Sequence, residues 1–176
     1  RAKEIDRKWG ANTGDFDTLE KIIKNNNSKT ILDIGCGSGR LFKLYKSLNI
    51  PEVVAQEISV DAIKICQNRY PELNYVYELK EIKNLTYSEN YFDLIISNKV
   101  LSAVLPSEIN EVIKKLAFIS KTIYINEPME DDPIKESNNW FKHNYTSIIS
   151  KYGFSILEEG NIVKSQSYKV YIKKVT

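Results

Sequence analysis

The residue types best suited to chemistry gather in one short stretch, Asp33-Ile-Gly-Cys-Gly-Ser-Gly39, which begins at the end of the apolar run 30–34. An acid is followed by three glycines at alternate positions. Glycine accepts positive φ and carries no Cβ, so backbone N–H groups in such a turn can approach a bound ligand closely. The stretch therefore predicts a tight ligand-binding turn between a strand and a helix, with a carboxylate beside it.

The glycine spacing separates two classes of nucleotide-like cofactor. The dinucleotide fingerprint is G-x-G-x-x-G. Counted from Gly35, its third glycine would stand at position 40, where the chain has Arg40. This disfavours an NAD-dependent oxidoreductase.

The pattern from Asp33 to Gly39 instead resembles motif I of the class I S-adenosylmethionine-dependent methyltransferases. That cofactor has no phosphate, and its amino group and sulfonium are positive, which suits an acid at the strand end. The resemblance implies a transferase that uses S-adenosyl-L-methionine and releases S-adenosyl-L-homocysteine. It also implies a Rossmann-like α/β fold, a doubly wound, seven-stranded, mostly parallel sheet of order 3-2-1-4-5-7-6 with strand 7 antiparallel.

A second acid, Glu57, ends the apolar run 52–57 and lies 18 residues beyond Gly39. In folds of this kind an acid about 20 residues after the glycine motif accepts hydrogen bonds from ribose hydroxyls. We therefore predict Glu57 as the ribose ligand and Ile58 as a contact of the adenine face. A solvated charge at the strand end is the alternative.

The third strand, about 73–79, is followed in the family by an acid and an apolar residue near adenine. The loop length before Phe92-Asp93 places Glu81 and Ile82 there, with Glu78 as the competitor. The alternative for both Glu81 and Glu78 is an acidic side chain on the surface with no contact to the cofactor.

Asn98 follows the apolar run 91–97, at the position of the family's motif IV. Ligands in open α/β sheets bind at the carboxyl ends of strands, so Asn98 is predicted to contact the methionyl part of the cofactor or the substrate. The sequence Asn98-Lys-Val-Leu101 lacks the Asn/Asp-Pro-Pro-Tyr/Phe of enzymes that methylate exocyclic amino groups. It also lacks the nucleophilic Cys that a cytosine-C5 enzyme requires.

A hydroxyl acceptor often requires a general base. His143 is the single histidine of the sequence and is the predicted base, against the alternative of a polar residue on a helix surface. Glu127 is a second candidate. The run Glu130-Asp131-Asp132 could hold a hard cation, but a solvated loop is the preferred interpretation, and no metal is predicted.

The lead-in, residues 1–14, contains Trp9 and is interpreted either as a lid over the cofactor or as a segment packed on the core. Residues 15–176 are predicted to form a single methyltransferase domain. The full set of predicted cofactor contacts is Trp9, Asp33, Gly35, Cys36, Gly37, Gly39, Glu57, Ile58, Glu81, Ile82 and Asn98.

The elements that must position these residues alternate along the chain. Apolar periodicity predicts helices near 15–24, 40–48, 59–69, 108–118 and 137–150, with Ser59 and Ser107 as N-caps and Cys66 as a buried residue. Strands are predicted at 30–34, 52–57, 73–79, 91–97 and 121–126, with a closing pair at 153–159 and 165–175. Such alternation is typical of a doubly wound sheet.

The bulk composition limits the partners. With 176 residues, 42% hydrophobic content and a net charge of +2, the chain suits one globular domain and gives no nucleic-acid signal. Two cysteines without metal spacing, no apparent signal peptide and no apolar run of about 20 residues predict a cytoplasmic protein outside the membrane. The expected partner is a small-molecule or carbohydrate substrate, and the oligomeric state stays open.

Two hypotheses for function follow. The first is a methyltransferase that acts on a small molecule or a sugar hydroxyl. The alternative is a non-catalytic subunit or regulator that binds the same cofactor on the same fold. This alternative stays open because the sequence has no large insertion that could form a substrate domain.

Overall fold

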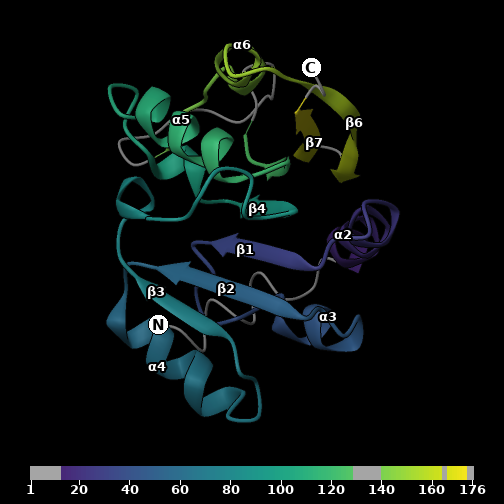
Figure 1. Ribbon diagram of the computed structural model, residues 1–176, viewed down its shortest axis with the longest axis vertical. Helices are drawn as coiled ribbons and strands as arrows, with labels where there is room; N and C mark the ends of the chain where they lie inside the picture. The colour runs from purple at the N-terminus through teal and green to yellow at the C-terminus, as the bar shows by residue number, and fades with distance from the viewer. Residues whose placement is uncertain (1–12, 129–139, 164–165, 174–176) are drawn as a thin grey trace.

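A seven-stranded sheet organises the computed structural model, which describes residues 13–128, 140–163 and 166–173 (Figure 1). Its order is β3-β2-β1-β4-β5-β7-β6. β1 to β5 run parallel, and β7 pairs antiparallel with both β5 and β6. The predicted topology is confirmed. The strands are β1 (Thr30–Ile34), β2 (Glu52–Glu57), β3 (Val76–Leu79), β4 (Leu94–Asn98), β5 (Thr122–Asn126), β6 (Phe154–Val163) and β7 (Gln166–Lys173).

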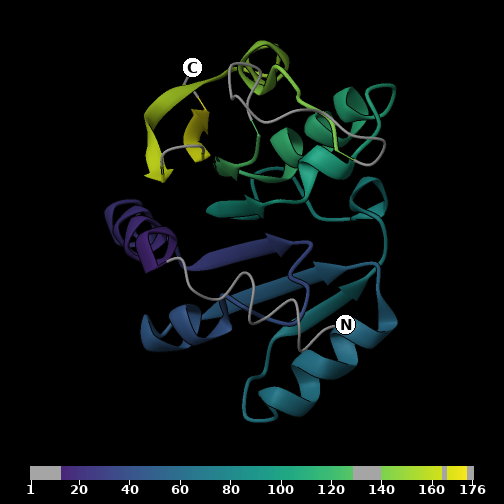
Figure 2. The same cartoon turned by 180° about the vertical axis from the view of Figure 1, so that it is seen from behind.

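Helices cover both faces of the sheet, as Figures 1 and 2 show from opposite sides. One core cluster joins Ile31 and Val53 to α2 (Thr13–Asn25), α3 (Phe42–Ser47) and α4 (Val60–Arg69). The other joins Leu32 and Val54 to α5 (Ile109–Ile119), α6 (Tyr145–Ser150) and the short 3₁₀ helices η1 (Ile82–Asn84) and η2 (Leu101–Ala103). Neighbouring residues of one strand thus enter opposite cores, as the period of two in a strand requires.

Two predicted local features are wrong. Of the helix predicted over 137–150, residues 137–139 lie outside the described residues and 140–144 are not helical; α6 begins at Tyr145, because the Asn144 side chain accepts a hydrogen bond from Ser147 N. The N–H of Phe141 instead donates to Ser102 O at 2.7 Å. Before α5, Glu108 rather than Ser107 is the N-cap, and it makes no side-chain capping bond.

Other predictions hold with small shifts. Ser59 caps α4 by accepting from Ala62 N, and Cys66 is fully buried on that helix. The third and fourth strands are shorter at their starts than predicted. Before β4, the residue Phe92 makes an isolated parallel bridge with Ser120.

Candidate active site

The glycine turn, residues 35–39, leaves β1 in left-handed backbone conformations. φ is 57° at Gly35 and 56° at Gly37, values that glycine adopts without strain. At Gly35 space is also missing, since a Cβ there would lie 2.4 Å from Cγ2 of Val100. At Gly37 the nearest atom to such a Cβ would be 4.0 Å away. The turn is thus closed against the segment after β4 at one glycine and open at the next.

Glu57, at the end of β2, is tied to this turn through its side chain. Oε2 accepts from Gly37 N at 3.0 Å, and Oε1 accepts from Ile58 N at 2.7 Å and Ser59 N at 3.0 Å. A carboxylate offers about four lone-pair sites. These three bonds fix its orientation and leave capacity for a ligand hydroxyl.

Gln56 is a neighbour that the sequence reasoning missed. The residue is 2% exposed, and its amide joins two segments: Oε1 accepts from Gly35 N at 3.0 Å, and Nε2 donates to Lys80 O at 2.6 Å. Because a buried carboxamide needs partners, an amide within the apolar run 52–57 was the available signal. Gln56 sets the distance between the glycine turn and the loop after β3.

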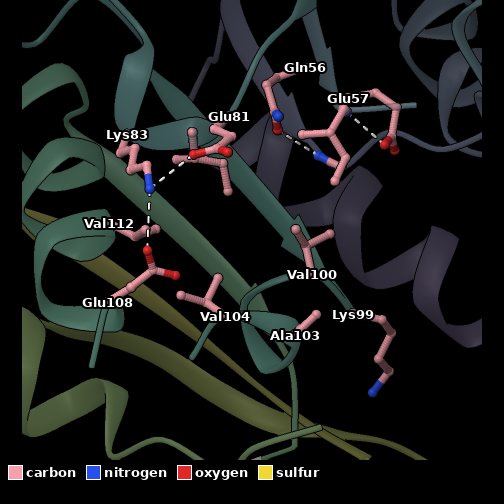
Figure 3. A pocket seen from close by; sticks show the side chains of 13 residues that line it. Gln56, Glu57, Glu81, Lys83, Lys99, Val100, Ala103, Val104, Glu108 and Val112 are labelled. Atoms are coloured by element: carbon pink, nitrogen blue, oxygen red, sulfur yellow. Dashed lines mark hydrogen bonds and ion pairs between the residues drawn. The ribbon is translucent and has the colours of Figure 1, made fainter. Parts of the chain in front are cut away.

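A cavity of about 420 Å³ opens beside these residues (Figure 3). Gly35, Gln56, Glu57 and Ile58 line one part of it. The remaining lining residues come from the start of η1, the segment after β4 and the beginning of α5: Glu81, Ile82, Lys83, Lys99, Val100, Ala103, Val104, Glu108 and Val112. The cavity lies at the carboxyl ends of parallel strands, where such sheets bind ligands.

The structure separates the two candidate acids after β3. Glu81 and Ile82 line the cavity, and Lys83 Nζ lies 3.0 Å from Glu81 Oε2. Glu78 is not a lining residue. It accepts from the Tyr87 hydroxyl at 2.7 Å and pairs with Lys80 at 2.6 Å. The cavity therefore favours Glu81 over Glu78 as the contact.

Asp33 lies buried at the end of β1, 3% exposed. Burial raises the pKa of its carboxyl to about 7, and the Tyr45 hydroxyl and the Arg40 guanidinium, which favour the ionised form, offset part of the effect. The carboxyl is thus balanced between its two forms at neutral pH. A cationic ligand group beside it would stabilise the ionised form.

Both cysteines are free and buried near the same backbone atom. The thiols of Cys36 and Cys66 lie 3.8 Å and 3.2 Å from Gly37 O. The neighbouring Cys66 thiol and burial raise the pKa of Cys36, so its side chain stays neutral and helps to fill the space behind the turn.

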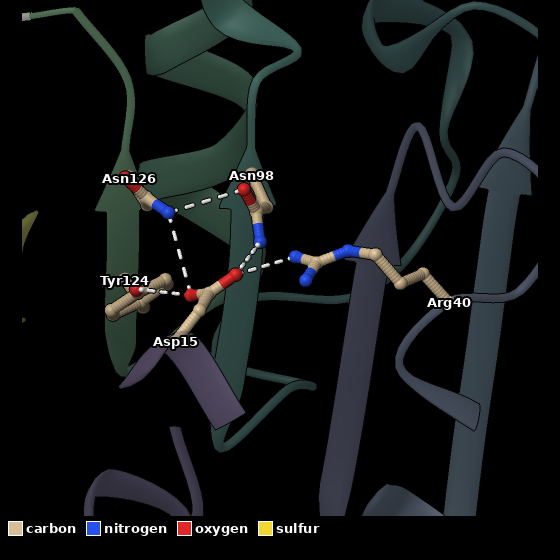
Figure 4. Close-up of polar contacts among 5 residues, drawn as sticks. All are labelled: Asp15, Arg40, Asn98, Tyr124 and Asn126. Carbon is tan, nitrogen blue, oxygen red and sulfur yellow. Dashed lines mark hydrogen bonds and ion pairs between the residues drawn. The ribbon is translucent and has the colours of Figure 1, made fainter. Parts of the chain in front are cut away.

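Asn98 belongs to a polar cluster centred on the Asp15 carboxylate (Figure 4). Oδ2 of Asp15 accepts from Arg40 at 2.5 Å and from Nδ2 of Asn98 at 2.8 Å. Oδ1 accepts from the Tyr124 hydroxyl at 3.2 Å and from Nδ2 of Asn126 at 3.4 Å. Asn126 Nδ2 also lies 3.2 Å from Oδ1 of Asn98. The cluster joins the start of α2 to the ends of β4 and β5 and to the glycine turn.

His143 is 5% exposed and lies against the segment after β4. Its Nε2 is 3.0 Å from Val104 O, and Val104 lines the cavity. Because a carbonyl only accepts, Nε2 donates the hydrogen in this bond. His143 is therefore a buried residue of the non-helical segment before α6, rather than a residue on the helix surface of the alternative interpretation.

Several predictions fall outside the described residues, namely Trp9, most of the lead-in 1–14 and the acidic run 130–132. Within the described ranges, no group of three or more His, Cys, Asp or Glu side chains is arranged to hold a metal ion. In the same ranges, no helix is long and apolar enough to cross a membrane.

The methyltransferase domain family matches residues 25–171. This match covers all seven strands except the last two residues of β7. The chain belongs to the methyltransferase domain family. Its cofactor is S-adenosylmethionine, which agrees with the acid and the three glycines that follow β1.

Sequence relatives of this methyltransferase domain are ribosomal protein L11 methyltransferases. The one from Caldicellulosiruptor saccharolyticus is 31% identical over 137 residues, which cover 76% of this chain and 43% of the relative. The one from Thermotoga petrophila is 31% identical over 80 residues, 46% of this chain and 30% of the relative. The chain thus spans less than half the length of the curated relatives that it matches.

Solved structures share the fold at low identity. Magnesium protoporphyrin IX methyltransferase from Synechocystis PCC 6803, with bound S-adenosylhomocysteine, has a TM-score of 0.75 at 16% identity, over 90% of this chain and 82% of that chain. The methyltransferase domain of the bacterial protein CtHen1-C has a TM-score of 0.76 at 14% identity, over 92% and 98% of the two chains. These likenesses confirm the class I methyltransferase fold.

Proposed function

We propose that this domain transfers the methyl group of S-adenosylmethionine to a hydroxyl of a small molecule, such as a sugar. The cavity residues suit the adenosine part of the cofactor: Glu57 offers acceptors for ribose hydroxyls, and Ile58 and Ile82 offer apolar contacts for adenine. Asp33 and Asn98 are proposed for the methionyl part. The bound cofactor would supply the methyl group, and the protein residues would align the acceptor and exclude water.

The observation that carries the hydroxyl proposal is the hydrogen bond between His143 and Val104, a residue that lines the cavity. A hydroxyl, unlike an amine, usually needs a base. The bond from Nε2 to Val104 O orients the imidazole ring beside the wall of the cavity. This link to the cavity wall supports His143 as the proposed base, although His143 itself is not one of the lining residues.

Cofactor binding is tested by calorimetry with S-adenosylhomocysteine. We expect binding by the wild type and none by Gly37→Arg, because the arginine would stand in the open space beside the turn. Absence of binding by the wild type, or unchanged binding by the variant, would contradict the pocket assignment.

The acceptor is tested by incubation with methyl-tritiated cofactor and extracts of metabolites and glycans. Label in a small polar product supports the proposal. Label in protein favours the second candidate, a protein acceptor, which is suggested by the similarity to ribosomal protein L11 methyltransferases over 137 residues. If no labelled product forms in any extract although the protein binds the cofactor, the non-catalytic alternative is favoured.

A further inference from the structure

Glu127, directly after β5, is fully buried, and both of its carboxylate oxygens are engaged. Oε1 accepts from the Ser97 hydroxyl at 2.6 Å, from Val100 N at 2.6 Å and from Leu101 N at 3.0 Å. Oε2 accepts from Ser102 N at 3.2 Å. A buried charge of this kind is tolerated only with such partners.

These donors belong to the segment that leaves β4. The strand ends at Asn98, and Lys99 then adopts φ of 64°, which is unusual for a residue with a side chain. The next three backbone N–H groups, at 100, 101 and 102, all point at the Glu127 carboxylate. The carboxylate therefore supplies the hydrogen bonds that the chain loses when it turns out of the sheet.

The same segment forms one wall of the cofactor cavity. Lys99, Val100, Ala103 and Val104 line it, and Figure 3 shows Val100 and Val104 on the side of the cavity away from Glu81. Val100 also packs on the glycine turn, because its Cγ2 occupies the space beside Gly35. A shift of the segment would change both the cavity and the turn.

We infer that Glu127 is a positioning residue that fixes the segment 99–104 against the glycine turn and so sets the affinity for the cofactor. It is not the general base that the sequence left open, because hydrogen bonds occupy both of its oxygens and it has no exposure. The inference rests on cofactor binding in this cavity and not on the identity of the methyl acceptor.

The test is Glu127→Gln, measured by calorimetry with S-adenosylhomocysteine. The substitution keeps the shape but removes the charge, and it sets an NH₂ group against a backbone donor. Because the segment 99–104 would then be held less firmly against the glycine turn, the expected result is a rise in Kd of about tenfold, equivalent to about 1.4 kcal/mol.

Asp93→Asn is the matched control. Asp93 also accepts from two backbone N–H groups, those of Lys29 at 3.0 Å and Thr30 at 3.1 Å, but it precedes β4 and so lies at the amino ends of the parallel strands, away from the cavity at their carboxyl ends. We expect this variant to lower the unfolding temperature and to leave the Kd within about twofold of the wild type.

The outcomes separate three roles. An unchanged Kd with a lower unfolding temperature in Glu127→Gln would mean a structural role alone and would overturn the inference. An unchanged Kd with a fall in kcat alone would restore Glu127 as a base.

If Glu127→Gln does not fold, the test is Ser97→Ala, because this substitution removes one of the four donors to the Glu127 carboxylate. A rise in Kd of about threefold supports the inference, and an unchanged Kd overturns it. Failure of the wild type to bind would instead overturn the cavity assignment itself.

Discussion

Asp33 is a single carboxyl that links stability, pH and ligand binding. Its pKa is raised by burial to about 7 from an ordinary value of 3.8. The folded state therefore holds a proton that the unfolded state releases between about pH 4 and pH 7, and the contribution of Asp33 to stability falls as the pH rises through this range. Above pH 7 the burial penalty is fully present.

Asp33→Asn removes this titration. A shift of one pKa unit corresponds to about 1.4 kcal/mol, so the stability of the variant relative to wild type should grow by roughly 2–3 kcal/mol between pH 5 and pH 7.5. Urea denaturation of both proteins at the two pH values measures it. A difference in unfolding free energy that does not change with pH would contradict the raised pKa.

His143 carries the prediction for catalysis at the residue scale. His143→Gln keeps an N–H that can donate to Val104 O but has no basic nitrogen. If His143 is the base, turnover with a hydroxyl acceptor should fall by about 10²–10⁴-fold. Binding of S-adenosylhomocysteine should stay within about twofold of the wild type. An unchanged turnover and pH–rate profile would remove His143 from catalysis.

At the scale of elements, helix α2 is fixed to the sheet by the Asp15 carboxylate. Asp15 and Arg40 form a pair at 2.5 Å with side-chain exposures of 5% and 25%, and three neutral donors complete the carboxylate's bonds. Removing one partner of a buried pair leaves the other uncompensated, which costs about 3–5 kcal/mol. Because Arg40 is partly exposed, the lower end of that range applies.

We therefore expect Asp15→Ala to lower the free energy of unfolding by about 3 kcal/mol. Glu20→Ala on the same helix is the control. Its 2.6 Å pair with Lys24 is solvent-exposed, and such a pair contributes at most about 0.5 kcal/mol. Denaturant titration compares the two variants. Equal losses would mean that the Asp15 cluster does not fix α2.

The elements also show what a sequence can reveal. Local signals predicted the bounds of β1 and β2 correctly, because apolar runs there are followed by a glycine turn and an acid. The sequence did not predict the Asp15 cluster. Its members range from position 15 to position 126, and only the order of the strands in the sheet brings them into contact. The helix prediction for 140–144 fails for the same reason. The hydrogen bond from Phe141 N to Ser102 O in η2 joins residues far apart in the sequence, so no local pattern indicates it.

At the scale of the whole molecule, the predicted cofactor residues lie at the ends of β1, β2 and β4 and in the loop after β3. The cavity, which Gly35, Glu57 and Glu81 line, exists only when the sheet is assembled, so a ligand bound there stabilises the entire fold. At a ligand concentration of 100 times Kd, this linkage contributes about 2.7 kcal/mol.

For a protein of this size, 1 kcal/mol moves the unfolding temperature by about 2–4 °C, so S-adenosylhomocysteine should raise it by roughly 5–10 °C. Differential scanning calorimetry measures the shift, and a single transition that moves as a whole would show that the strands unfold together. The Gly37→Arg variant should show no shift at the same ligand concentration, which separates binding at the turn from general effects of the ligand. A transition that splits, with only one part moved by the ligand, would mean that the cavity-forming strands unfold separately from β6 and β7.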